Sequence, residues 1–91
     1  MTRREAVARL EIMLKIIERL PEIDNVYPDV GDYNRGCSIQ IQHDDAVAVI
    51  ERTFGVKLKR EPRGFGLSCD SAFKWKASAI VDSVEIFTLL R

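Results

Sequence analysis

The chain has 91 residues, of which 46% are hydrophobic and 31% charged, and its formal net charge is zero. This length and composition are typical of a single globular domain over residues 1–91 and exclude a disordered tail. The sequence has no apolar run of bilayer length, and charges interrupt the apolar positions of its first twenty residues, unlike a secretory signal. We therefore expect a cytoplasmic protein with no membrane contact.

The zero net charge conceals three blocks of unequal sign. Residues 1–20 contain five basic and three acidic residues. Residues 21–51 contain one basic and seven acidic residues, and residues 52–91 contain eight basic and four acidic residues. An asymmetry of this size can stabilise a fold internally or orient a charged partner.

The first block has the periodicity of a helix that begins after Thr2 and ends before Pro21. Thr2 and Glu5 have the spacing of a capping box. At about 100° per residue the apolar side chains fill one broad arc, so we expect this helix to be a core element. The arc consists of Ala6, Val7, Leu10, Met13, Leu14, Ile16, Ile17 and Leu20.

Residues 21–35 are predicted to form a long acidic connection with two prolines. Its tyrosines, Tyr27 and Tyr33, accompany Asp29 and Asp32, and tyrosine is favoured in contact surfaces. The connection is therefore a candidate binding loop. Alternatively, its carboxylates form salt bridges within the fold, to Lys57, Lys59, Arg60 or Arg63. The spacing of a calcium loop is absent.

Residues 37–42 alternate as a half-buried strand, and a second helix is predicted from His43-Asp44-Asp45 to Phe54. An aspartate is the expected N-cap, and Gly55 is the expected stop. The lone histidine beside two aspartates could suggest a metal site or an acid/base pair. No second histidine or spaced cysteine completes a coordination sphere, so we expect capping, no catalytic residue, no cofactor and no bound metal.

Residues 56–60 alternate again, and a turn at 61–64 is predicted to lead into a strand at 65–69. The closing hairpin pairs residues 73–81 with residues 84–90 around a two-residue turn, Asp82-Ser83. The sequence therefore predicts an α+β fold with two helices packed on one face of a mostly antiparallel four- to five-stranded sheet, in the order α-β-α-β-β-β(β).

The hairpin register places basic and apolar side chains together on the sheet face away from the helices. These side chains are Lys74, Lys76, Ile80, Phe87 and Leu89. Apolar groups rimmed by charge indicate an interaction surface, for a protein partner or for a homodimer. The alternatives are nucleic-acid binding through the lysines and a solvated face whose lysines protect strand edges.

The ending W-K-A-S-A-I-V-D-S-V-E-I-F-T-L-L resembles the closing hairpin of small uncharacterised α+β proteins of actinobacteria and their phages. Those hairpins have a V-D-G-V-type turn, and Ser83 stands here in place of the glycine. The resemblance implies a bacterial or phage-encoded accessory protein of the cytosol and carries no catalytic residue. We therefore expect a non-enzymatic binding or adaptor protein that acts through protein contacts or self-association; the alternative is a nucleic-acid-binding accessory protein using the basic strands.

Overall fold

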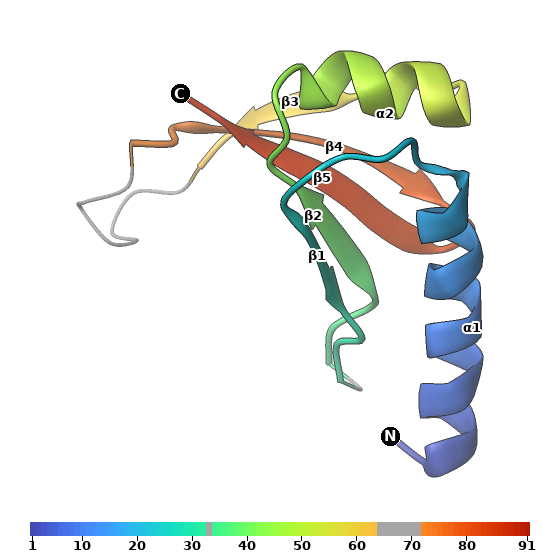
Figure 1. Cartoon of the computed structure of the whole chain (residues 1–91). Helices are drawn as coiled ribbons and strands as arrows, with labels where there is room; N and C mark the ends of the chain where they lie inside the picture. Colours follow the sequence, from blue (N-terminus) through green and yellow to red (C-terminus); the bar gives the residue numbers. More distant parts are fainter. Residues whose placement is uncertain (33, 64–71) are drawn as a thin grey trace.

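The computed structural model describes residues 1–32, 34–63 and 72–91 and shows an α+β fold with two helices and a five-stranded mixed sheet (Figure 1). In chain order the elements are α1 (Arg3–Arg19), β1 (Val26–Asp29), β2 (Ser38–Ile41), α2 (Ala46–Phe54), β3 (Lys59–Pro62), β4 (Trp75–Val81) and β5 (Val84–Leu90). Neither helix in the described part of the chain has the length and apolar character of a membrane span.

Helix α1 begins and ends where the sequence predicts. The Thr2 hydroxyl accepts a hydrogen bond from the Glu5 N–H at 3.1 Å, which satisfies one of the free donors of the first turn. At the other end Leu20 leaves the helix with extended backbone, and its N–H donates to the Ile17 carbonyl at 3.0 Å. Pro21 follows directly, as a residue that cannot continue a helix.

The closing hairpin is confirmed in its register and in its turn. Strands β4 and β5 pair antiparallel from Trp75 opposite Leu90 to Val81 opposite Val84. Asp82 and Ser83 have φ values of 50° and 66°. Two successive residues in the left-handed region are what a type I′ turn requires, and this turn matches the twist of the strands it joins.

The sheet has the strand order β1-β2-β5-β4-β3, and its neighbouring strands are antiparallel except β2 and β5, which are parallel. The Gln42 side chain prolongs the parallel pair after β2 ends, because its amide accepts from the Leu89 N–H at 2.6 Å and donates to the Leu89 carbonyl at 3.3 Å. Both edge strands contain a proline, Pro28 in β1 and Pro62 in β3, and proline discourages pairing with a further strand.

Strand β1 corrects the prediction that residues 21–35 form only a connection. Val26 lies opposite Ile41 and Asp29 opposite Ser38, so four residues of this segment join the sheet. Pro28 lacks an N–H group, but an edge strand tolerates it because only one side of the strand is paired.

The core lies between the helices and one face of the sheet. It contains Met13 and Ile16 from α1, Ala46 and Ile50 from α2, and the sheet residues Ile39, Ile41, Val84 and Ile86. Both helices therefore pack on the same face, as predicted.

The predicted apolar arc of α1 is buried only in part. Met13 and Ile16 are buried, whereas Val7, Leu10 and Leu14 are 44%, 53% and 56% exposed. Figure 1 shows that the start of α1 lies beyond the ends of β1 and β2. Leu14 directly follows the buried Met13, so it is exposed because it lies on a different side of the helix.

The start of α2 also differs from the prediction. Asp45 occupies the N-cap position, but its φ is 57° and its side chain makes no capping hydrogen bond. A capping side chain reaches the first-turn N–H groups from extended backbone, which a left-handed residue does not provide. The predicted stop is confirmed, because Gly55 has a φ of 66° and its N–H donates to the Glu51 carbonyl at 2.9 Å.

The strand predicted at residues 56–60 begins later. Strand β3 spans Lys59–Pro62, and all four of its residues are exposed. The strand predicted at 65–69 lies outside the described residues.

Candidate binding face of the sheet

One row of paired residues crosses all five strands on the side away from the helices. Residues that pair across neighbouring strands point their side chains to the same face of a sheet. The row consists of Tyr27, Gln40, Phe87, Ser78 and Lys59. Phe87 follows the buried core residue Ile86 in β5, so the row lies opposite the core.

A second row, nearer the β4–β5 turn, brings the acidic segment and the closing hairpin together. It runs from Asp29 through Ser38 and Glu85 to Ile80. On the other side of the first row, Leu89 pairs with Lys76, and Lys76 with Glu61. We call this surface the outer face and define it by Tyr27, Asp29, Ser38, Gln40, Lys59, Glu61, Lys76, Ser78, Ile80, Glu85, Phe87 and Leu89.

Large apolar side chains of the outer face are open to solvent. Ile80 is 66% exposed and Tyr27 is 53% exposed, while Phe87 and Leu89 are half-buried. A depression of about 540 Å³ lies over this region and is lined by Asp29, Ser38, Ile80, Glu85 and Phe87 among others. The face thus offers both a hollow and protruding apolar groups to a partner.

Lys76 is held in place by two neighbours at the middle of the face. Its ammonium lies 2.9 Å from the Glu85 carboxylate and 4.6 Å from the centre of the Phe87 ring. The Lys76 and Glu85 side chains are only about one-third exposed, so water screens this ion pair less than a fully exposed one. The positive charge of Lys76 is therefore already balanced within the chain.

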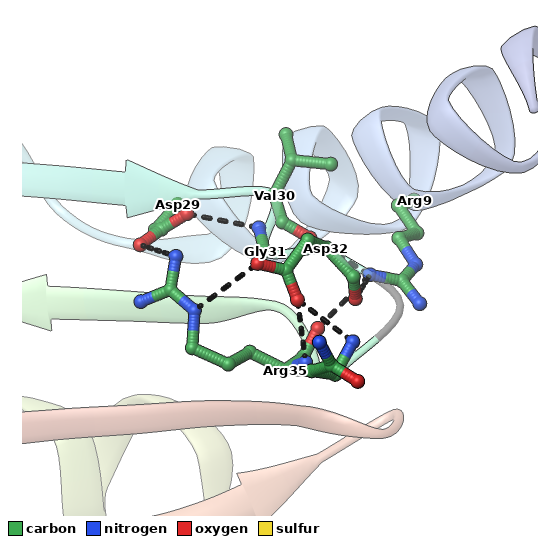
Figure 2. A network of polar contacts seen from close by, with 7 residues as sticks. Arg9, Asp29, Val30, Gly31, Asp32 and Arg35 are labelled. Atoms are coloured by element: carbon green, nitrogen blue, oxygen red, sulfur yellow. Dashed lines mark hydrogen bonds and ion pairs between the residues drawn. The ribbon is translucent and has the colours of Figure 1, made fainter. Parts of the chain in front are cut away.

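Two carboxylates of the acidic segment, those of Asp29 and Asp32, have partners close to them in the chain. Asp29 accepts from the Gly31 N–H at 2.8 Å, and Asp32 accepts from the N–H groups of Asn34 at 2.7 Å and Arg35 at 2.9 Å. The Arg35 guanidinium lies 3.6 Å from Asp29 and 3.8 Å from Asp32 (Figure 2). The hydrogen bond from Asn34, followed by that from Arg35, lowers the pKa of Asp32 below its ordinary value.

The ion pairs of Asp29 and Asp32 differ from the predicted alternative of salt bridges to Lys57, Lys59 or Arg60. Asp29 and Asp32 pair with Arg35 of their own connection, and Lys59 pairs with Glu61 at 3.4 Å. Within residues 1–32, 34–63 and 72–91, Asp29 and Asp32 therefore share one side of the sheet with Lys59 without forming an ion pair with it.

Arg9 ties α1 to the connection between β1 and β2. Its Nη1 donates to the carbonyl oxygens of Val30 at 3.0 Å, Asp32 at 3.1 Å and Arg35 at 3.2 Å (Figure 2). Sequence reasoning missed this role because backbone carbonyls in a connection leave no residue pattern to recognise. The guanidinium therefore holds in place the tip of the β1–β2 hairpin, the part of the connection that lies next to Asp29 and contains Asp32.

Glycine is required at position 31 for the same tip to close. Gly31 has a φ of 77°, and a Cβ atom there would lie 2.5 Å from the carbonyl oxygens of both Arg35 and Gly36. No side chain fits at that distance, so this position enforces the close approach of the two ends of the connection.

The structure brings most of the predicted site residues onto one surface. Tyr27, Asp29, Lys76, Ile80, Phe87 and Leu89 lie on the outer face. Asp32 lies in the β1–β2 connection beside it, and Lys74 precedes β4, where its N–H donates to the Leu90 carbonyl at 2.9 Å. Tyr33 is outside the described residues. The two predicted sites, the acidic loop and the hairpin face, are thus neighbouring parts of one surface.

The region around His43 does not show an acid/base pair in the described part of the chain. A depression of about 740 Å³ is lined by His43, Asp44 and Asp45 among others. The His43 Nδ1 accepts a hydrogen bond from the Asp24 N–H at 3.3 Å, and no described carboxylate bonds to the imidazole. Residues 1–32, 34–63 and 72–91 contain no group of three or more histidine, cysteine or acidic side chains placed to hold a metal ion.

The chain matches no protein-family model, no curated protein and no solved structure. The resemblance of residues 73–90 to actinobacterial and phage proteins stays a prediction. The case for a function therefore rests on the geometry of the outer face.

Proposed function

We propose that this chain is a non-enzymatic binding or adaptor protein whose outer face receives another protein. The observation that carries the proposal is the strand register, which gathers Tyr27, Phe87 and Ile80 on the side of the sheet opposite the helices. None of the described elements packs over this side, and Ile80 is the most exposed of its large apolar residues.

The chemistry of the outer face suits a protein partner. Protein interfaces combine a few aromatic or aliphatic anchors with a polar rim. Here Ile80, Phe87 and Tyr27 supply the anchors, and Ser38, Gln40 and Ser78 supply uncharged polar groups between them. Carboxylates and ammonium groups at its border set the orientation of a partner more than its affinity.

Nucleic-acid binding through the basic strands receives less support. Binding to a nucleic acid requires basic side chains that are free to neutralise phosphates and so release the counterions condensed on the nucleic acid. Lys76 and Lys59 are paired with Glu85 and Glu61, and Asp29 adds a further negative charge to the same surface. A phosphate backbone would meet mixed charge here instead of a positive groove.

The proposal is tested by capture and equilibrium binding of a partner from the native host, with Ile80→Asp as the variant. Because Ile80 is exposed, the substitution leaves the fold intact while it places a charge among the anchors. The matched control is Ala48→Asp, which adds the same charge at an exposed position of α2 on the other side of the sheet.

We expect Ile80→Asp to weaken binding by about tenfold or more, equivalent to about 1.4 kcal/mol, and Ala48→Asp to have no effect. Equal binding by both variants would contradict the proposal. Binding to DNA or RNA that falls steeply with salt and is lost in Lys76→Gln would favour the nucleic-acid alternative.

A further inference from the structure

The apolar arc of helix α1 is wider than the part of it that the fold buries. The exposed residues Val7, Leu10 and Leu14 lie within about 60° of one another around the helix axis. Their sector is roughly 120° away from the buried Met13 and Ile16. The exposed edge of the arc leaves apolar side chains available for a further packing partner. We call Val7, Leu10 and Leu14 the α1 stripe.

Opposite charges mark the two ends of the α1 stripe. Arg3 lies in the same angular sector one turn before Val7, and Glu18 borders the sector one turn after Leu14. Both side chains are exposed, and neither forms an ion pair with another side chain of the described residues. Arg19, by contrast, is engaged by the Phe54 ring at 4.7 Å.

We propose that a second copy of this chain packs its α1 antiparallel against the α1 stripe, with the two-fold axis between positions 10 and 11. In this register Val7 of each copy lies beside Leu14 of the other, and the two Leu10 side chains meet near the axis. Arg3 and Glu18 are each about 11 Å from the axis along the helix, so Arg3 of each copy faces Glu18 of the other.

Charge complementarity selects a second copy in this orientation. The α1 stripe is apolar at its centre, positive at its N-terminal end and negative at its C-terminal end, so it is complementary to itself when one helix is reversed. A parallel pair would bring Arg3 against Arg3 and Glu18 against Glu18, and would align the two helix dipoles unfavourably. The antiparallel pair is also the isologous contact of a two-fold dimer.

The proposed dimer leaves the outer face open. Helix α1 packs on the opposite side of the sheet, so pairing through α1 would present two outer faces in one particle. Two linked sites bind a partner with repeated epitopes more tightly than one site does. This inference goes beyond the proposed function, and each can fail without the other.

Analytical ultracentrifugation of the full chain over a range of concentrations tests the dimer. We expect the wild type to dimerise reversibly and Leu14→Glu to be monomeric throughout. Because Leu14 is 56% exposed, the far-UV circular dichroism of this variant should equal that of the wild type. Phe87→Asp on the outer face is the control and should dimerise like the wild type.

Charge reversal tests the orientation of the helices. We expect Arg3→Glu and Glu18→Arg each to raise the dimer dissociation constant about three- to tenfold, and the double variant to return it toward the wild-type value. Each substitution also places a charge that interacts favourably with the helix dipole, so a weaker dimer cannot come from a weaker helix.

A wild type that stays monomeric at every concentration overturns the inference. A dimer that persists in Leu14→Glu also overturns it. A dimer that dissociates only in Phe87→Asp would overturn it too, because the second copy would then bind on the outer face. If the double reversal fails to restore the dimer, the antiparallel register is wrong.

Discussion

Replacing Arg9 with alanine tests whether α1 holds the tip of the β1–β2 connection in place. The Arg9 Nη1 donates to three carbonyl oxygens at 3.0, 3.1 and 3.2 Å. Alanine is the strongest helix former, so the substitution removes these contacts without weakening α1 itself.

The size of the effect follows from the geometry. Nη1 carries two hydrogens for three carbonyls, so the contacts amount to fewer than three full bonds. The contacts to Asp32 and Arg35 are exposed, and water can replace them, whereas the contact to Val30 is partly buried. A bond from a charged donor contributes about 1.5–3 kcal/mol, so we expect Arg9→Ala to cost about 2 kcal/mol of unfolding free energy. For a domain of this size the Tm should fall by on the order of 10 °C.

Urea denaturation followed by circular dichroism gives the free energy of unfolding. Hydrogen exchange at the Arg35 amide reports on the tip directly, because this N–H donates to the Asp32 side chain at 2.9 Å. Arg9→Lys is the control; it keeps the charge but loses the planar donors, so we expect an intermediate loss. If the free energy of unfolding of Arg9→Ala lies within about 0.5 kcal/mol of the wild-type value and exchange at Arg35 is unchanged, Arg9 does not hold the connection in place.

Three further substitutions probe the sheet and its tip. Gln42→Ala removes the amide that continues the pairing with β5 and should lower the free energy of unfolding by about 1–3 kcal/mol in urea denaturation. Ser83 has a φ of 66°, which glycine adopts without strain, so Ser83→Gly should raise the free energy of unfolding by about 0.5–1 kcal/mol. The pKa of Asp32 is lowered in the folded state, so its stabilisation is present above its ordinary pKa and is lost as the pH falls through the folded value. Thermal unfolding at a series of acidic pH values should therefore show a smaller loss of Tm on acidification for Asp32→Asn than for the wild type.

The register and turn of the closing hairpin could be predicted because the information for them is local, although β4 begins at Trp75 and not at the predicted residue 73. Alternation along β4 and β5 fixes which side chains share a face, and the Asp82-Ser83 turn fixes the register between the two strands. The cap at Thr2 and the stop at Gly55 are equally local, and both are confirmed.

That the acidic segment and the closing hairpin lie on one face of the sheet could not be predicted, because this arrangement depends on pairings between distant segments. Strand β1 has four residues and contains Pro28, so its own sequence argues against a strand until β2 lies beside it. The parallel contact of β2 with β5 joins residues more than forty positions apart, such as Ser38 and Glu85. The sequence therefore indicated two separate surfaces where the sheet has one.

The exposure of α1 was hidden from sequence reasoning for a different reason. Periodicity shows which side chains of a helix are apolar, but it does not show how far the neighbouring sheet extends. Val7, Leu10 and Leu14 continue the apolar arc of the buried residues, and only their exposure in the structure reveals that nothing in the described fold covers them.

Site-specific photo-cross-linking shows whether a partner binds on the outer face. A photoreactive amino acid is placed at Ile80 on the outer face and, in a second protein, at the exposed position Arg52 on α2. We expect a host protein to cross-link from position 80 and not from position 52. Cross-linking from position 52 with none from position 80 would contradict this expectation.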